Sequence, residues 1–354
     1  MKQQVVRFAA TPTGRVAYSV TGSGPPLVYL LGWVSHLGLM WEIPEHRRFV
    51  EALEREHTVI RYDKVGCGLS DRARTDFTME SELATLEALV EHLKLGRFAL
   101  FGSCEGGQVA AAYAVRHPDV LSSLIVYGSC ARGADLAPDE IKHSVLSLVR
   151  AHWGLGSRVL ADIWLPGTPV DLTAMFARMQ RAAATAEMAA SLLDMFYRLD
   201  IADLLPMIRV PTLVAHRRNS RAVRMELGRE LAALIPGAQL AALDGRMQPI
   251  YAEDPDAAAS TLLSFLRDQS APNGPKVGGG PLTARELQVA DLVADGLTNP
   301  EIARTLGVSV RTVDAHVDHV RTKLGVRARA QIAVWARLTP TVPTRGGKPK
   351  LELH

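Results

Sequence analysis

Residues 98–116 contain the stretch Phe101-Gly102-Ser103-Cys104-Glu105-Gly106-Gly107, which follows the apolar run Phe98–Phe101 and leads into a helical pattern ending at Arg116. A short apolar run that ends in glycine is typical of a buried strand. A strand that turns directly into a helix is the repeating unit of an α/β fold. We therefore expect Cys104 to lie at a strand-to-helix turn.

The same alternation extends on both sides of this turn, from Val16 to about Leu266. Helical patterns cover Ser81–His92 and Glu226–Ile235. Further short, β-rich apolar runs occur at Leu27–Leu31, Val59–Tyr62, Leu124–Tyr127, Thr212–Ala215 and Gln239–Leu243. This order predicts a parallel sheet covered by helices.

The interval from about 132 to 206 breaks the alternation. It has a helical pattern and is rich in methionine, phenylalanine and tryptophan. We interpret it as a helical cap inserted over one edge of the sheet. Most of its large side chains are expected to form the core of the insertion, and some are expected to line a cavity below it.

The chain divides into four predicted segments. A large α/β domain covers 1–268, and a run rich in glycine, proline, serine and asparagine over 269–280 has the composition of a flexible linker. A small all-α domain covers 281–338. Residues 339–354 have the composition of a disordered tail.

The bulk composition excludes several classes of protein. With 354 residues, 47% hydrophobic and 22% charged, the chain resembles an ordinary globular protein of two domains. Its longest apolar runs are too short to span a bilayer, and we expect no membrane association. The first residues, Met1–Gln4, form no apolar run, so we expect no secretion signal. Cys67, Cys104 and Cys130 form no CxxC pair and no cluster with histidine, so we expect a cytoplasmic protein with no metal, cofactor or structural disulfide.

Four helices are predicted after the linker. Their expected ranges are Thr283–Ala294, Asn299–Leu306, Ser309–Leu324 and Ala328–Leu338, and the first three begin at a capping residue. Glu286 completes a capping box with Thr283. A short helix, a turn at Gly307 and a longer helix form the layout of a helix-turn-helix.

The residues from Leu282 to Leu338 resemble the LuxR/GerE-type DNA-binding domain. The resemblance is carried by Leu282–Glu286, Asn299–Ala303, Ser309–His316 and Lys323–Val326, which are spread over the predicted helices. It implies that the third helix lies in the major groove of double-stranded DNA and that a homodimer binds two half-sites. The alternative is a four-helix module that binds another protein.

The third helix has two predicted faces. The inward face is Val310, Val313, Val317, Val320 and Leu324. The candidate DNA-binding residues are Arg311, Thr312, Asp314, Ala315, His316, Asp318, His319 and Lys323. Of these, Arg311, Thr312, His316 and Lys323 are expected to contact phosphates. The stretch from Ser309 to Arg329 is locally basic, as a surface that faces phosphate should be.

Asp314 and Asp318 stand where several relatives carry basic residues. A carboxylate can accept a hydrogen bond from cytosine N4, so one hypothesis is that Asp314 or Asp318 reads a C·G pair. The alternative is that both are solvated charges near the positive end of the helix dipole.

Three stretches of the first domain resemble the α/β-hydrolase fold. They are Leu31-Gly32-Trp33, Asp63–Asp71 with its G-x-G-x-S-D pattern, and Phe101–Gly107 with the spacing of a nucleophile elbow. In that spacing Gly102 and Gly106 are the flanking glycines, and Cys104 takes the nucleophile position.

The other two catalytic positions of this family are changed. The acid position holds Ser220, and the segment where relatives place the histidine offers Met247. Methionine accepts no proton, and serine cannot stabilise an imidazolium. Asp135 is a possible relocated acid, but it lacks a histidine to orient. The sequence therefore predicts a degenerate hydrolase domain.

We interpret the chain as a ligand-responsive transcriptional regulator. A small, largely apolar molecule is expected near Trp33, Cys104, Glu105 and Met247, where backbone N–H groups of Trp33 and Glu105 could hold a ligand oxygen. Cys104 is an inert thiol, a ligand contact or a covalent sensor of electrophiles. The alternative functions are a cysteine-dependent esterase or lactonase coupled to DNA binding, and a constitutive regulator whose first domain only dimerises the chain.

Overall fold

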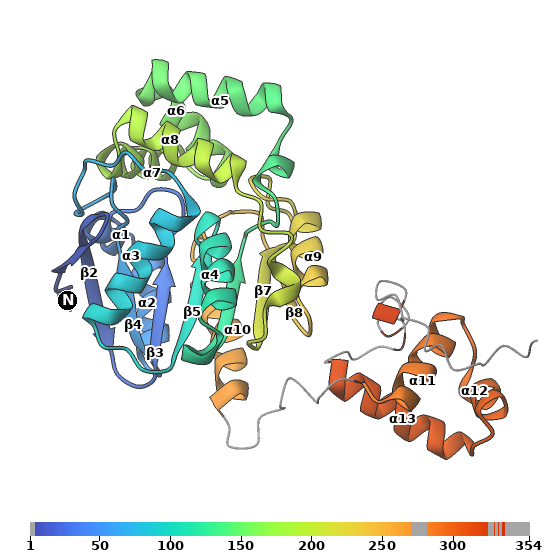
Figure 1. Ribbon diagram of the computed structural model, residues 1–354. Helices are drawn as coiled ribbons and strands as arrows, with labels where there is room; N and C mark the ends of the chain where they lie inside the picture. The colour runs from blue at the N-terminus through green and yellow to red at the C-terminus, as the bar shows by residue number, and fades with distance from the viewer. Residues whose placement is uncertain (1–3, 271–281, 325–328, 330–331, 333–334, 337–354) are drawn as a thin grey trace, which may run out of the picture. The chain divides into compact units, whose positions relative to one another are not determined.

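The computed structural model describes residues 4–270, 282–324, 329, 332, 335 and 336, and the chain divides into two compact units, 1–275 and 276–354 (Figure 1). Most of the predicted linker, most of the fourth predicted helix and the whole predicted tail lie outside the described residues. Gln269 and Ser270, assigned to the linker from sequence, continue the last helix of the first unit.

A mixed sheet organises the first unit. Within the described residues it has eight strands in the order β1-β2-β4-β3-β5-β6-β7-β8. The strands are β1 (Arg7–Thr11), β2 (Gly14–Gly22), β3 (Pro26–Leu30), β4 (Thr58–Tyr62), β5 (Phe98–Ser103), β6 (Leu121–Tyr127), β7 (Thr212–Arg217) and β8 (Gln239–Leu243). All six predicted strands are present and mutually parallel. The antiparallel pairing of β1 with β2, and of β2 with β4, was not predicted.

Helices cover both faces of the sheet, because alternate strand residues point to opposite sides. Leu27, Tyr29 and Val59 belong to one core cluster, whereas Val28 and Ile60 belong to the other. The first face carries α2 (Pro44–Glu54) and α10 (Pro255–Ser270), which pack on each other, with α1 (Leu37–Glu42) beside them. The second carries α3 (Met79–His92), α4 (Glu105–Arg116) and α9 (Met225–Leu234).

The predicted cap is present between β6 and β7. It contains α5 (Asp139–Ala151), α6 (Trp153–Trp164), α7 (Val170–Ala183) and α8 (Ala186–Arg198), with short 3-10 helices at Gly133–Leu136 and Leu205–Met207. In Figure 1 the four cap helices lie beyond the carboxyl ends of the strands. The cap thus covers the end of the sheet where Cys104 follows β5.

The described part of the second unit contains α11 (Ala284–Ala294), α12 (Asn299–Leu306) and α13 (Val310–Leu324). The capping box between Thr283 and Glu286 is present. The N-cap of α12 is Thr298 rather than the predicted Asn299, and its side chain forms a capping box with Glu301. Gly307 ends α12 in the left-handed conformation, with φ of 65°.

The buried core of this unit includes three of the predicted inward residues of α13: Val313, Val317 and Val320. Val310 is an exception, because 42% of it is exposed in the first turn of the helix. The side chain of Leu324 lies outside the described residues. None of the described helices is long and apolar enough to cross a membrane.

Candidate functional site

Cys104 lies at the turn from β5 into α4, as predicted. Its backbone has φ of 53° and ψ of −125°, and it is the N-cap of α4. A positive φ is unfavourable for a residue with a Cβ. The Cys104 N–H donates to the Tyr127 carbonyl at 2.9 Å, and a Cβ at Gly102 would collide with the Gly106 carbonyl. The turn therefore has the constrained backbone of a nucleophile elbow.

Gln248 is the side chain opposite the Cys104 thiol. Its Nε2 donates to Cys104 Sγ at 3.3 Å and to the Gly128 carbonyl at 2.9 Å. Its Oε1 accepts from the Ser220 hydroxyl at 2.7 Å. Because a carbonyl only accepts hydrogen bonds, the Gly128 contact fixes which end of the amide carries the nitrogen. Both amide protons are therefore committed, one of them to sulfur.

The sequence predicted Met247 at the position opposite the thiol, whereas the structure places the next residue, Gln248, there. Met247 packs at the margin of the core and lines a separate recess of about 170 Å³ with Phe176 and Tyr251. Ser220, which the sequence places at the acid position of the family, bonds to Gln248 and so lies next to the residue that faces the thiol. Asp135, considered as a relocated acid, lies in the Gly133–Leu136 helix and faces Arg132 at 3.9 Å.

The loop that presents Gln248 is held in place by two charged side chains, Glu253 and the buried Arg217. Glu253 accepts from the Arg246 N–H at 2.8 Å and from the Met247 N–H at 3.2 Å. The buried Arg217 guanidinium donates to the Asp244 carbonyl and to the Ile250 carbonyl, the latter at 2.8 Å. Gln248 is therefore a fixed part of the cavity wall.

The Cys104 thiol is buried and protonated at neutral pH. Burial raises its pKa, while the hydrogen bonds from Gln248 and Ser103 and the nearby charge of Lys64 act in the opposite direction without reversing the shift. A helix N-terminus such as the start of α4 favours a thiolate, but desolvation outweighs this effect at Cys104. Burial also raises the pKa of the free thiols Cys67 and Cys130, with Lys64 acting in the opposite direction at Cys67 only.

Glu105 does not project its carboxylate toward a ligand. Its buried side chain forms an ion pair with Lys64, from the segment after β4, and both side chains are at most 6% exposed. A second buried pair, Arg74–Glu82, lies close by with an N–O distance of 2.5 Å. Lys64 and Arg74 together lower the pKa of Glu82, although burial alone would raise it. The backbone N–H of Glu105, at the first turn of α4, has no intrahelical acceptor.

The Trp33 side chain, which we expected to line the cavity, instead connects the sheet to the cap. Its indole is fully buried, and Nε1 donates to the Ala189 carbonyl of α8 at 2.9 Å. The ring also meets the edges of Trp153 and Trp164, with centroid distances of 6.0 and 5.2 Å. Its sequence neighbours Gly32 and Val34 line the cavity instead.

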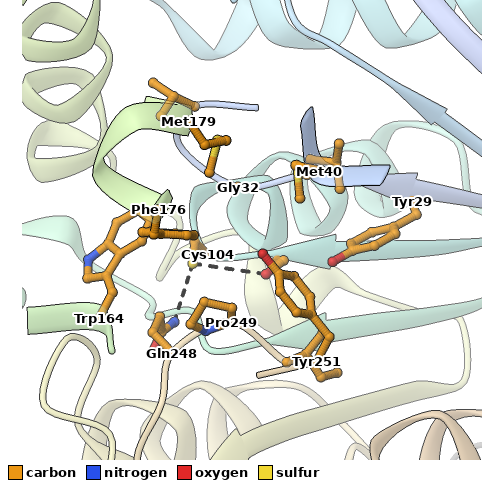
Figure 2. A pocket seen from close by; sticks show the side chains of 14 residues that line it. Tyr29, Gly32, Met40, Cys104, Trp164, Phe176, Met179, Gln248, Pro249 and Tyr251 are labelled. Atoms are coloured by element: carbon orange, nitrogen blue, oxygen red, sulfur yellow. Dashed lines mark hydrogen bonds between the residues drawn. The ribbon is translucent and has the colours of Figure 1, made fainter. Parts of the chain in front are cut away.

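Two cavities meet at Cys104. The smaller one, of about 50 Å³, lies over Tyr29 and is bounded by Gly32, Phe176 and Tyr251 (Figure 2). The larger one, of about 310 Å³, lies under α5, α6 and α8. Cys104, Trp164 and Gln248 line both. Binding cavities for small molecules have volumes from about 300 Å³ upward, so only the larger one has room for most of a ligand.

The outward face of α13 is exposed along much of its length. Arg311, Thr312, Asp314, Ala315, Asp318 and His319 are exposed, and His316 and Lys323 are half-buried. Three of the eight candidates have short side-chain contacts inside the unit, including Thr312, whose hydroxyl lies 2.7 Å from the Ser309 hydroxyl. Lys323 Nζ contacts Glu286 Oε2 at 2.6 Å, and Asp314 Oδ1 accepts from Asn299 Nδ2 at 2.6 Å.

The Asp314 contact belongs to a chain of hydrogen bonds. Asn299 Oδ1 accepts from Arg329 at 2.5 Å, and Arg329 also donates to the Leu297 carbonyl. Asp318 Oδ1 lies 3.5 Å from Arg321 of the next turn. The described residues contain no group of three or more potential ligands that could hold a metal ion.

Both predicted families are found when the chain is compared with known proteins. The family model described as bacterial regulatory proteins of the luxR family matches residues 280–336. The model described as the alpha/beta hydrolase fold matches residues 25–151.

Among curated relatives, the oxygen regulatory protein NreC of Staphylococcus aureus is 46% identical over 55 residues, which are 16% of this chain and 25% of NreC. The chain thus spans about a quarter of the length of the curated relatives that it matches.

Solved structures match the first unit. The enol-lactonase from Burkholderia xenovorans is 26% identical, with a TM-score of 0.64 over 74% of this chain and 100% of its own. A thermophilic esterase from Thermogutta terrifontis is also 26% identical, with a TM-score of 0.63 over 76% of this chain and 100% of its own. A bromoperoxidase from Bacillus anthracis, at 20% identity and a TM-score of 0.66 over 74% of this chain and 100% of its own, supports the fold alone.

Proposed function

We propose that this protein, in which an α/β hydrolase fold domain precedes a LuxR-family helix-turn-helix domain, is a DNA-binding transcriptional regulator. In this proposal the hydrolase fold domain binds a small, largely apolar molecule without turning it over. The helical domain supplies DNA binding, and occupancy of the cavity changes the strength of that binding.

The observation that carries the proposal is the hydrogen bonding of Gln248. A general base must accept a proton from the nucleophile, and it must stand within hydrogen-bond distance of it. Gln248 stands there but donates to sulfur, and its second proton is held by the Gly128 carbonyl. A buried, protonated thiol beside a donor supports binding rather than turnover.

The exposed face of α13 supports the DNA-binding part. Arg311, Thr312 and His316 are suited to phosphate contacts, while Ala315 and His319 face outward where base edges would lie. Lys323 is a weaker candidate than its sequence suggested, because Glu286 already neutralises it. A homodimer on two half-sites one helical turn apart remains part of the proposal.

A second function, a cysteine-dependent esterase or lactonase, is favoured by the elbow itself. The strained backbone of Cys104 presents Sγ to both cavities, and the start of α4 offers free N–H groups for a ligand oxygen. The likeness to an enol-lactonase and an esterase at 26% identity points the same way. The absence of a proton acceptor opposite Sγ, among the described side chains that bond to it, argues against efficient turnover.

The test of the proposed function has two arms. Purified protein should hydrolyse p-nitrophenyl acetate and butyrate no faster than its Cys104→Ala variant. The same protein should enrich a defined sequence from random double-stranded DNA, and Arg311→Ala should weaken binding to it, whereas the exposed cap variant Arg158→Ala should not. Multiple turnovers that disappear in Cys104→Ala would favour the esterase. Failure to enrich any DNA sequence would overturn the regulatory function.

A further inference from the structure

The larger cavity has a chemical character that narrows the class of ligand. Resting on the proposed function, we propose that it binds an apolar carboxylic acid, with the carboxylate at Arg221 and Tyr197 and the apolar body extending toward Cys104. The smaller cavity, at about 50 Å³, accepts only the last few atoms of such a molecule.

Aliphatic and aromatic side chains form most of the wall. They come from the cap and from the segments that follow β6 and β7: Leu136, Ile141, Val145, Leu160, Ile163, Leu193, Phe196 and Val223. A wall of this kind favours an apolar body, because each buried methylene contributes about 0.8 kcal/mol when it leaves water. Ile141 is 54% exposed, so the cavity reaches solvent near the start of α5.

The inner end of the cavity offers few donors to a ligand. Both amide protons of Gln248 are committed to protein atoms, the Cys104 S–H is a weak donor, and the Trp164 indole supplies one N–H. This end therefore suits the apolar part of the molecule, and the polar part is expected elsewhere.

Two side chains of the wall, the exposed Arg221 and the half-buried Tyr197, are donors without protein acceptors among the described residues. In the described part of the chain, the Arg221 guanidinium has no carboxylate partner, unlike Arg218 nearby, which pairs with Asp244 at 3.0 Å. The Tyr197 hydroxyl also has no hydrogen-bond partner there. Burial raises the pKa of Tyr197 to about 12, so the hydroxyl keeps its proton and donates at neutral pH. A guanidinium and a phenol together match a carboxylate.

Asp162 of α6 is the one carboxylate in this wall, among the described residues, and it forms no ion pair with Arg221. It repels a second negative charge on the ligand. The cavity therefore favours a monocarboxylate over a dicarboxylate, and the carboxylate belongs on the Arg221 side.

Calorimetric titration of the full chain with octanoate, 1-octanol and octylamine tests the proposal, because these probes share one apolar body. Octanoate should bind at least tenfold more tightly than octanol, and octylamine more weakly than either. Arg221→Met should lower octanoate affinity about tenfold and leave octanol unchanged. Arg218→Met is the matched control and should change neither. Asp162→Asn should raise octanoate affinity, and Val145→Trp should abolish binding of all probes by filling the cavity.

The outcomes separate this proposal from the proposed function. Equal binding of octanoate and octanol, or an unchanged octanoate affinity in Arg221→Met, overturns the carboxylate assignment while the cavity remains a ligand site. Tighter binding of octylamine assigns the polar end to Asp162 instead and also overturns the proposal. Failure of all three probes to bind overturns the cavity as a ligand site, and with it the sensing part of the proposed function.

Discussion

The elbow at the start of α4 in the hydrolase fold domain can be compared with the start of α13 in the LuxR-family domain. The two differ in whether their side chains already bond to other residues of the same domain. At the elbow, Cys104 is bonded to Gln248 and Glu105 is neutralised by Lys64, all within the domain. On α13, Arg311 and Ala315 face solvent. The elbow side chains are thus paired inside their own domain, whereas Arg311 and Ala315 of α13 remain exposed to solvent.

The largest expected effect comes from restoring a proton acceptor at the elbow. In the double variant Ser220→Asp and Gln248→His, an imidazole would stand within reach of Sγ and a carboxylate behind it. Because general-base assistance contributes about 10²–10⁴-fold, kcat/KM for p-nitrophenyl acetate should rise by about that factor. Adding Cys104→Ala should remove the gain. If the wild-type protein had the same kcat/KM as the double variant, the elbow would not lack a proton acceptor, and its proposed difference from the start of α13 would be wrong.

The buried ion pair beside the elbow should be costly to break and easy to replace. Lys64→Met or Glu105→Leu alone leaves one uncompensated buried charge, which typically costs about 3–5 kcal/mol. The double variant removes both charges and should be close to wild type. Urea denaturation followed by tryptophan fluorescence reports mainly on this domain, since four of the five tryptophans, Trp33, Trp41, Trp153 and Trp164, belong to it and only Trp335 lies in the helical unit. Equal losses in the single and double variants would show that the pair acts through something other than charge.

The two aspartates of α13 should differ from each other. Asp314 is bonded to Asn299, which ties it to the start of α12, so Asp314→Ala should weaken binding at all sequences together. Asp318 has a longer contact, with Arg321, and is the better candidate for cytosine. A base contact is worth about 1–3 kcal/mol of discrimination. Operator selection with each variant measures it, and an unchanged base preference at every position in Asp318→Ala would overturn the reading role.

The smallest effect concerns Glu286, whose pKa falls from its ordinary 4.5 to about 2. Burial opposes this shift, but hydrogen bonds from Lys323 and Thr283 outweigh it. Because the pKa is lower in the folded state, the stabilisation is complete above about pH 4.5 and is lost as the pH falls toward 2. An NMR titration of the Glu286 carboxyl should show this pKa in the wild type and a higher one in Lys323→Met. An equal value in both would exclude the ion pair as the cause.

Five of the six strands that the sequence predicted have apolar runs that are largely buried, and such runs stand out without any partner, whereas β8 was predicted although none of its residues is buried. The β1–β2 hairpin escaped prediction since it lies at the sheet edge, where Phe8 is exposed and the pattern is weak. Helices α1 and α2 were also missed. The cap was predicted as an interval because its composition breaks the strand-helix rhythm.

The site was predicted less completely than the fold. Cys104 follows from the glycine spacing around it, which is local. Gln248 does not, because a loop carries no periodicity that would distinguish position 247 from 248, and its role depends on Gly128, 120 residues away. Trp33 was assigned to the cavity from its place after β3, whereas the cap it ties to is distant in sequence. Val310 fits the helical repeat but lies in the first turn of α13, at the edge of the core.

The backbone at Cys104 has a mechanical consequence. Cys104 has a φ of 53° between closely packed glycines, and its thiol is bonded to Gln248 in a loop that is itself held by hydrogen bonds. This part of the cavity wall is therefore rigid. A molecule bound in the larger cavity would therefore contact a rigid surface at Cys104 and Gln248. The opposite wall consists of α5, α6 and α8, which form part of a separate helical layer. If the cavity binds a ligand as proposed, deformation on binding is therefore expected in the cap rather than at the elbow.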